Sequence, residues 1–338
     1  MKKRLILAGS LRLLLIGGCT LALCLAGCGT SDENRLDREE QNRLNGSEDE
    51  TGNGKEGEDN NNTDAPKEND MEQYKNHVKV MSYNVYYQDV VETRTSNIWD
   101  LVLKNDPDVL MLQEVSQDWI PYVQDFMAAN GYSYYGYGRY GGELSEAELK
   151  NGEQFVPVLW KTEKYELVDS GHYWLSSTPE VYSAAWMDGT ISKYPRCVNW
   201  VILKDKETGG EFMALNIHTD PENDLVRTNS CKLTAQKVTE IRAGRPAVLG
   251  GDWNMSITDS AYYAVTEGGY LDVRFKAIET TTSGSFNAWG KREEGNYAFG
   301  DHLFMSEDMG AKSYEVVDDR YDGAHISDHC PIQAELYY

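Results

Sequence analysis

The chain has 338 residues, a formal net charge of −23 and six cysteines. Proteins that grip long nucleic acids usually present a basic face, because neutralising phosphates releases counterions, so this charge argues against tight nonspecific nucleic-acid binding. It does not exclude a small or weakly bound phosphate substrate, particularly where a divalent cation supplies local positive charge.

Residues 1–28 have the pattern of an export signal, in which basic residues precede an apolar run that ends in small residues. The run closes with Leu25-Ala26-Gly27-Cys28, which resembles a bacterial lipobox and predicts cleavage before Cys28 and attachment of lipid to its thiol. A plain signal peptide or a retained membrane anchor is the alternative, since a transmembrane helix needs roughly 20 apolar residues. In each case we expect the rest of the chain to lie outside the cytoplasm, and with the lipid it would be anchored to the cell membrane.

Residues 29–76 have almost nothing to bury, with 15 Asp or Glu against 6 Lys or Arg. Such a composition predicts a disordered acidic tether, because it cannot offset the entropy of the chain. The signal and the tether together carry −5 of the total −23, which leaves −18 for residues 77–338. That part suits one large domain or two small ones. It keeps only Cys197, Cys231 and Cys330, which permit one disulfide at most, so its core must hold the fold.

Strands and helices alternate at the start of residues 77–338, strand-like runs follow one another in the middle, and alternation returns towards the end. This order favours an α/β fold in which two packed sheets have helices outside them. Helical periodicity covers residues 98–102, 119–127, 226–243 and 260–266. The predicted strands are residues 78–83, 108–114, 155–160, 165–168, 173–175, 197–203, 212–217, 246–249, 302–305, 314–317 and 331–336.

Polar residues interrupt the apolar runs where several of these strands end. A carboxylate such as Glu114, at the end of a buried strand, is costly unless it is paired or bound to a cation; backbone amides could also satisfy it. Asp252 follows another apolar strand and could instead belong to an Asx turn. Asp301-His302 and Asp328-His329 each place a carboxylate beside an imidazole, an arrangement used in acid-base and phosphate chemistry.

Taken together, six segments resemble the endonuclease/exonuclease/phosphatase superfamily, in its secreted bacterial lipoprotein branch, over residues 77–338. They occur in the family's order with sensible spacing. The segments are Met81-Ser82-Tyr83-Asn84, Asp108 to Glu114, Leu215-Asn216-Ile217-His218-Thr219-Asp220, Gly251-Asp252-Trp253-Asn254, Gly300-Asp301-His302-Leu303-Phe304 and Ser327-Asp328-His329-Cys330-Pro331.

The resemblance implies a four-layer α/β/β/α sandwich with two packed mixed sheets, and a phosphoesterase that uses Mg2+, with Mn2+ as a possible substitute. Glu114, with Asn84 nearby and Asp328 in support, would bind the metal. Asp252 would orient or deprotonate the attacking water, and Asn254 would hold that water and the phosphate.

The remaining implied roles fall on histidines and an arginine. His329, fixed by Asp301, would stabilise the transition state. His218 would contact phosphate or assist the leaving oxygen, and Arg196 would touch phosphate. Glu153 could pair with His218, although its spacing to the next strand is one residue long.

Three functions stay open on these grounds: a phosphoesterase acting on a diester or a monoester, a nuclease acting on extracellular nucleic acid, and a noncatalytic surface lipoprotein that binds sugars or a partner protein. Tyr86, two residues after Asn84, stands where several nucleases of the family have a charged side chain, which weakens a DNA-repair function. No obligate protein partner is evident from the sequence.

Two further motifs predict little. Gly136 to Gly141 matches G-x-G-x-x-G, but no strand-helix-strand unit surrounds it, as dinucleotide binding requires. His325 and His329 have the four-residue spacing of zinc-binding helices, but Ser327, Asp328 and Pro331 argue against a helix there. We therefore interpret His325 as a loop residue without a catalytic role.

Overall fold

The computed structural model describes residues 68–144 and 150–338. The predicted export signal, the predicted lipid attachment at Cys28 and most of the predicted tether lie outside the described residues. Ahead of the expected domain boundary at residue 77, a short 3-10 helix, η1 (Glu68–Gln73), precedes the first strand. Met71 of η1 is buried and packs beside Gly310, which explains why this end of the predicted tether is folded.

Helices lie between strands near the start and in the second half of the described chain, whereas β4 to β9 follow one another without a helix. The helices are α2 (Glu92–Asn105), α3 (Ile120–Asn130), α4 (Asp224–Arg242) and α5 (Ser260–Thr266), with further 3-10 turns η2 (Gln117–Trp119) and η3 (Val273–Phe275). The strands are β1 (His77–Asn84), β2 (Val109–Gln113), β3 (Val115–Ser116), β4 (Tyr132–Tyr135), β5 (Gln154–Phe155), β6 (Val158–Lys161), β7 (Tyr165–Trp174), β8 (Cys197–Asp205), β9 (Glu211–His218), β10 (Ala247–Asp252), β11 (Tyr270–Asp272), β12 (Glu279–Thr280), β13 (Asp301–Ser306), β14 (Gly310–Val316) and β15 (Ile332–Tyr337).

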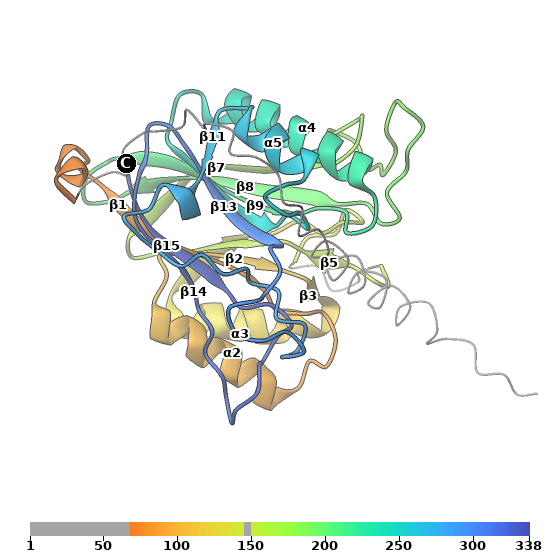
Figure 1. Ribbon diagram of the computed structural model, residues 1–338, viewed down its shortest axis with the longest axis horizontal. Coiled ribbons are helices and arrows are strands. Elements are labelled where there is room, and N and C mark those ends of the chain that lie inside the picture. Colours follow the sequence, from red (N-terminus) through yellow and green to blue (C-terminus); the bar gives the residue numbers. More distant parts are fainter. Residues whose placement is uncertain (1–67, 145–149) are drawn as a thin grey trace, which may run out of the picture.

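Two large sheets pack face to face with helices outside both (Figure 1). The first sheet has the order β12-β14-β15-β1-β2-β6-β4, and the second has the order β11-β13-β10-β9-β8-β7. Both are mixed: β1 runs parallel to β2 and β9 runs parallel to β10, while their other neighbours are antiparallel. Helices α4 and α5 cover the second sheet, and α2 and α3 cover the first (Figure 1). The predicted four-layer α/β/β/α fold is confirmed.

Alternation along the central strands builds these layers. In β1, Val78 and Val80 point into the cluster between the sheets, whereas Met81 and Tyr83 join the cluster under α2 and α3. In β2, Met111 is in the first cluster, and its neighbours Leu110 and Leu112 are in the second. A strand with helices on one side and a sheet on the other is apolar throughout, which explains the continuous run in β2.

The helices end where the sequence indicates. Asp106, which precedes Pro107, closes α2 in the left-handed region with a φ of 48°, and Gly131 closes α3 at a φ of 69°. The side chain of Asn223 caps α4 by accepting hydrogen bonds from the amides of Leu225 and Val226.

The middle of the chain differs from expectation. The runs at residues 165–168 and 173–175 are one strand, β7, whose pairing with β8 shifts between Leu167 and Asp169. The irregularity explains the difference, because a bulge interrupts the two-residue alternation by which strands are recognised in a sequence.

A buried polar bridge joins the two sheets. Gln113 Nε2 at the end of β2 donates to Asn216 Oδ1 in β9 over 2.7 Å, and Asn216 Nδ2 donates to the carbonyl of Leu112 over 2.7 Å. Both side chains are fully buried. Buried side-chain amides stabilise a fold only where hydrogen bonds to their partners are made. This bridge therefore fixes the carboxyl end of β2 against β9.

Gly251 is required where β10 passes β9. A Cβ built on Gly251 would lie 2.0 Å from the carbonyl oxygen of Ile217, and the residue has a φ of 154°. Backbone cannot move aside as a flexible side chain can.

We therefore expect Gly251→Ala to lower the free energy of unfolding by about 2 kcal/mol or more, as measured by urea denaturation. Gly300→Ala is the matched control, because its Cβ would meet neighbouring atoms at ordinary distances of 3.6 and 3.7 Å. Equal free energies of unfolding in the two variants would contradict the requirement for glycine at position 251.

None of the helices within residues 68–144 and 150–338 is long and apolar enough to span a bilayer. Cys197, Cys231 and Cys330 are all buried free thiols, so the described residues contain no disulfide, as the cysteine count allowed.

Candidate active site

Sheet topology brings the predicted polar residues to one edge of the sandwich. Asn84 is the last residue of β1, and His218 and Asp252 are the last residues of the parallel strands β9 and β10, paired in register with each other. Asp301 begins β13, which runs antiparallel to β10 and pairs Asp301 with Asp252. Carboxyl ends of parallel strands meet at one edge, where loops supply binding groups. The six segments therefore converge.

Asp252 is the hub of this cluster and is fully buried. Its Oδ2 accepts a hydrogen bond from Asn84 Nδ2 over 3.1 Å and lies 3.4 Å from His218 Nε2 and 3.8 Å from His329 Nε2. Its Oδ1 accepts from the amide of Asn254 over 3.0 Å. Burial by itself would raise the pKa of Asp252, but the two imidazoles and these hydrogen bonds outweigh it and lower the pKa. Asp252 is thus a carboxylate able to accept a proton.

His329 is held by Asp301. Its Nδ1 lies 2.7 Å from Asp301 Oδ2, which also accepts a hydrogen bond from the hydroxyl of Ser285. Burial opposes a charge on the ring, yet the carboxylates of Asp301 and Asp252 raise the pKa of His329 well above its ordinary value. The Nδ1 proton points to Asp301, so Nε2 carries a proton towards Asp252 and the open side of the site.

His218 has the opposite character. Arg196 Nη1 lies 3.1 Å from its Nδ1, so the guanidinium donates there and a neutral ring has its proton on Nε2, towards Asp252. Burial and the positive charge of Arg196 lower the pKa of His218 well below the ordinary value. The site therefore combines a cationic imidazole, His329, with a neutral one, His218.

Glu153 does not pair with His218, a pairing that the resemblance suggests and that the spacing to the next strand puts in question. Its Oε1 instead accepts a hydrogen bond from the amide of Tyr140 over 2.7 Å. The partner of His218 on that side is Arg196, a difference of pairing that sequence spacing could not resolve.

Glu114 and Asp328 provide oxygen donors next to this cluster. Burial and the negative charge of Asp328 raise the pKa of Glu114 to about 7. Burial likewise raises the pKa of Asp328, and Asp252 adds to the effect. Two neighbouring buried carboxylates, both with raised pKa values, favour a bound divalent cation. With the amide oxygen of Asn84 they form the oxygen-rich donor set that Mg2+ prefers, so these residues fit the predicted metal.

A tighter group, Asp252, Asp301 and His329, also has ligand atoms within 4.8 Å of one another. In this group the Nδ1 of His329 already bonds to Asp301. We interpret it as a hydrogen-bonded relay, because a metal there would have to break that bond.

Several residues at the site have left-handed backbone without being glycine: Glu114 has a φ of 60°, Asn254 of 50° and Tyr86 of 59°. Each such residue costs of order 1–3 kcal/mol and persists where the surroundings require it. In Glu114 the turn lets Oε2 accept a hydrogen bond from the amide of Tyr87 over 3.0 Å. The side chain of Asn254 donates to the carbonyl of Thr219 over 3.4 Å.

Arg94 is a positioning residue that sequence reasoning missed. It donates to the carbonyls of Val85, Tyr86, Gln88 and Asp89, and to that of Ile326. It thereby ties the loop after Asn84 to the loop that carries Asp328 and His329. A lone arginine near the start of a surface helix has no sequence signature for this task.

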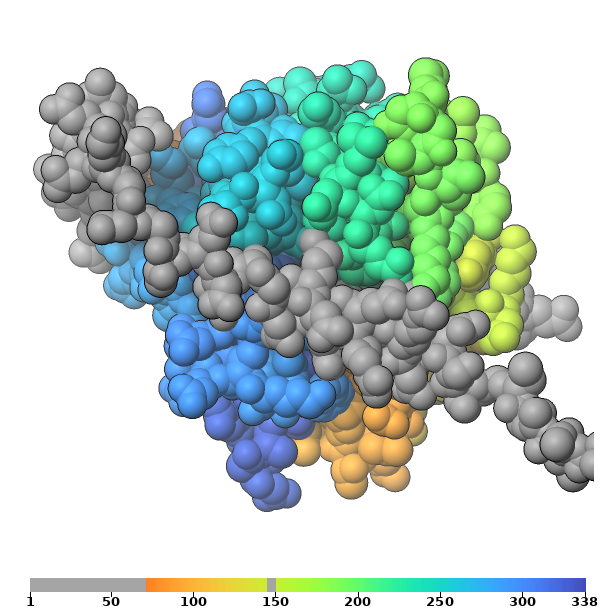
Figure 2. Space-filling view, turned by 45° about the vertical axis from the view of Figure 1, so that its right-hand side comes forward, coloured from red at the N-terminus to blue at the C-terminus, as the bar shows by residue number. Residues whose placement is uncertain are grey.

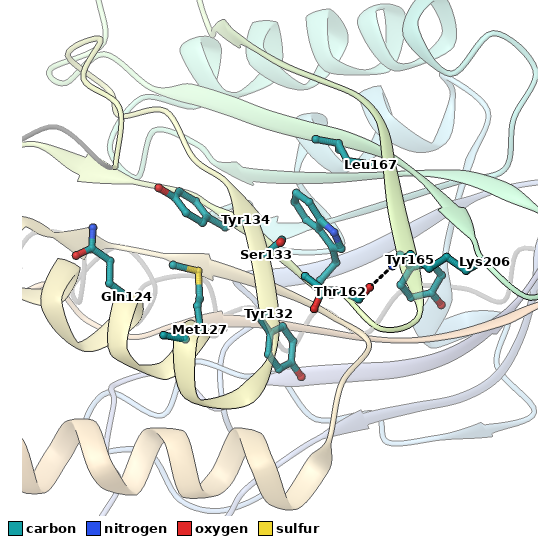
Figure 3. A pocket seen from close by; sticks show the side chains of 11 residues that line it. Gln124, Met127, Tyr132, Ser133, Tyr134, Thr162, Tyr165, Leu167 and Lys206 are labelled. Atoms are coloured by element: carbon teal, nitrogen blue, oxygen red, sulfur yellow. Dashed lines mark hydrogen bonds between the residues drawn. The ribbon is translucent and has the colours of Figure 1, made fainter.

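A surface hollow of about 680 Å³ lies elsewhere, between α3 and the strands β4, β6 and β7 (Figure 3). Tyr132, Tyr165 and Lys206 are among its lining residues, and none of the candidate site residues lines it. The candidate active site therefore lies at the converging strand ends and not in this hollow.

Comparisons with known proteins agree on one family. A sequence model described as the Endonuclease/Exonuclease/phosphatase family matches residues 81–329. No curated protein matches the chain.

Among solved structures, an endonuclease/exonuclease/phosphatase family protein from Bacteroides thetaiotaomicron is 28% identical, with a TM-score of 0.68, over 78% of this chain and 98% of the other. A mannosyl-6-phosphatase from the same organism is 28% identical, with a TM-score of 0.67, over 77% of this chain and 100% of the other. The human Nocturnin catalytic domain, at 17% identity and a TM-score of 0.59 over 77% of this chain and 94% of that domain, shares the fold.

Proposed function

Because the chain belongs to the endonuclease/exonuclease/phosphatase family, we propose that it is a Mg2+-dependent phosphoesterase, with Mn2+ as a possible substitute. The single observation that carries this proposal is the meeting of Asn84, His218 and His329 around one carboxylate oxygen of Asp252, at 3.1, 3.4 and 3.8 Å. Members of this family are phosphoesterases and nucleases, and the buried carboxylates of Glu114 and Asp328 beside the cluster could hold a metal.

Asn84, Glu114 and Asp328 would hold the metal, which when bound supplies positive charge beside a phosphoryl oxygen. Asp252 accepts the proton of a water whose oxygen forms a bond to phosphorus while the bond to the leaving oxygen breaks. Asn254 holds that water and the phosphate. His329 stabilises the negative charge that develops on phosphoryl oxygens, because it is cationic and rigidly held by Asp301. The neutral His218 donates from Nε2 to a phosphate or leaving oxygen.

A phosphate monoester of a small polar molecule is the substrate class that these charges favour. Arg196 touches His218, and Arg139 is near enough for its positive charge to lower the pKa of His218 further. A monoester dianion gains more from two guanidinium groups than a diester monoanion does. The 28% identical structure named a mannosyl-6-phosphatase supports a sugar phosphate as the first compound to test.

A nuclease acting on extracellular nucleic acid is the alternative function. The net charge of −18 over residues 77–338 disfavours it, because a long polyanion would be repelled outside the immediate site. A noncatalytic binding module is a further alternative, and it predicts no turnover of any phosphate ester.

We propose that the enzyme works at the extracytoplasmic face of the cell membrane, anchored by lipid on Cys28. The support is the signal pattern with Leu25-Ala26-Gly27-Cys28 and the acidic segment after it. Incorporation of labelled fatty acid into the chain, and its loss in Cys28→Ser, is the expected result. Unlabelled chain released into the medium would contradict the anchor.

The proposed activity is tested with purified protein against mannose 6-phosphate, bis-p-nitrophenyl phosphate, sphingomyelin, DNA and RNA. We expect release of phosphate from the sugar phosphate with Mg2+ or Mn2+, and loss of that activity in EDTA that returns when Mg2+ is added in excess. Preferred cleavage of nucleic acid would establish the nuclease instead. Absence of turnover on every substrate with both metals would reject the phosphoesterase.

A further inference from the structure

A second group of metal-ligating side chains lies behind the candidate active site. Asp318 Oδ1 lies 3.5 Å from His325 Nδ1 and 3.7 Å from Cys330 Sγ. One ligand atom from each residue lies within 4.8 Å of the other two. None of these three residues has a role in the proposed hydrolysis, so the cluster calls for a separate explanation.

The spacing of these atoms matches what zinc requires. Zn2+ binds sulfur at about 2.3 Å, imidazole nitrogen at about 2.0–2.1 Å and carboxylate oxygen at about 2.0–2.2 Å in tetrahedral geometry. Two ligand atoms on such an ion are therefore ~3.3–3.6 Å apart, close to the two distances observed. A thiolate with an imidazole selects zinc, whereas Mg2+ prefers oxygen ligands alone.

The groups around the cluster orient its ligand atoms inwards. The hydroxyl of Tyr297 donates to Asp318 Oδ2 over 2.7 Å and lies 3.4 Å from His325 Nε2. The guanidinium of Arg320 also faces Asp318 Oδ2, at 3.4 Å. Oδ1 of the carboxylate and Nδ1 of the imidazole are thus left directed at Cys330. Partners of this kind on the outer atoms fix the orientation of metal ligands in known sites.

Burial supports the same assignment. The side chain of His325 is 5% exposed and that of Asp318 is 18% exposed, while Cys330 is buried at 3%. Asn287 Nδ2 lies 3.5 Å from the sulfur of Cys330, which suits a sulfur that bears negative charge. Asp318 provides the more exposed side, from which an ion could enter.

We propose that Asp318, His325 and Cys330 form a Zn2+ site, separate from the catalytic metal, with water as the fourth ligand. Binding forms a Zn–S bond and releases the thiol proton of Cys330 to solvent, with no change of oxidation state. The inference goes beyond the proposed function, since it would hold for a noncatalytic protein as well.

The position of the site explains what it would do. Asp318 follows β14 by two residues, Cys330 precedes β15 by two residues, and His325 lies in the loop between them. The same loop carries Asp328 and His329. Figure 2 shows the segment near residue 290 beside the segment near residue 320 on one face of the molecule. A metal that joins the two ends of the loop would restrict Asp328 and His329 to their positions.

Cobalt distinguishes this site from the catalytic one, because only thiolate ligation gives a sulfur-to-cobalt charge-transfer band in the near ultraviolet. Metal-free full-length protein should develop the band with one equivalent of Co2+ and lose it when Zn2+ is added. Cys330→Ser should lack the band. Cys197→Ser, which removes another buried thiol, and Glu114→Gln, which alters the catalytic metal site, should both retain it.

Zinc content gives a second measurement that does not depend on activity. After dialysis, the wild type and Glu114→Gln should each retain about one zinc per chain, and His325→Gln should retain none while its circular dichroism is unchanged. His325→Gln covers the case in which Cys330→Ser fails to fold. Absence of the band in the wild type, or an equal band in Cys330→Ser, would show that these residues are only hydrogen-bonded to one another and would overturn the proposal.

Discussion

Asp252→Asn is expected to reduce kcat for phosphate-ester hydrolysis by roughly 10³-fold or more, since an amide cannot accept the proton of the attacking water. The substitution is nearly isosteric, and the one amide oxygen of the new side chain can still accept a hydrogen bond from either Asn84 Nδ2 or the amide of Asn254. KM should change much less than kcat, because the lost interaction is used in the transition state. Steady-state kinetics on the substrate preferred in the panel measure both constants.

Asp205→Asn is the matched control for this variant. Asp205 is also a buried aspartate at the end of a strand, but it ends β8, which runs antiparallel to β9 and so terminates at the opposite edge of the sheet. Its Oδ1 accepts hydrogen bonds from the amides of Glu207 and Thr208. We expect full activity from the control. A wild-type rate in Asp252→Asn would remove Asp252 from the mechanism and with it the proposed function.

His329→Gln is expected to lower kcat by roughly 10²–10³-fold, the usual effect of removing one group that stabilises charge in a transition state. The glutamine amide can donate a hydrogen bond, but it carries no positive charge. Asp301→Asn should show a smaller loss in the same direction, because His329 then loses the carboxylate that raises its pKa and fixes its ring.

The double variant tests whether the two residues act as a unit. Its loss should be close to that of His329→Gln by itself, since Asp301 acts through His329. Losses that simply multiply would contradict this relay. His77→Gln is the control for histidine substitution, because His77 is exposed at the start of β1, and it should retain the wild-type rate.

Much of the fold could be predicted from local pattern. Apolar runs ended by polar residues located β1, β2, β9, β10 and β13, and the glycine or proline after α2 and α3 marked their ends. These features are local, because propensity, capping and alternation act over a few residues. The bulged strand β7 and the folded residues ahead of 77 were missed, since the first breaks the alternation and the second depends on packing against a distant strand.

In the candidate site, too, local pattern predicts some features, and others depend on contacts between distant segments. Residue type and position at strand ends singled out Asn84, His218, Asp252, Asp301 and His329, and the structure brings them together. Their partners were not predictable: the partner of His218 is Arg196 and not Glu153, and the importance of Arg94 follows from five carbonyls in two loops. Which side chains become hydrogen-bond partners depends on distances of a few ångströms between segments that are far apart in the chain.

His325 illustrates the limit most clearly. The sequence argues against a helix at residues 325–329, which the structure confirms, and on that ground it predicts that His325 is a loop residue without a catalytic role. In the folded chain it faces Asp318 and lies near Cys330, contacts that no helical spacing describes. Residue type and local pattern are therefore enough to predict which chemical groups are present and on which strand ends they stand, because those properties are local. Which groups meet follows from the packing of two twisted sheets and from where the loops between them close, and neither is a local property.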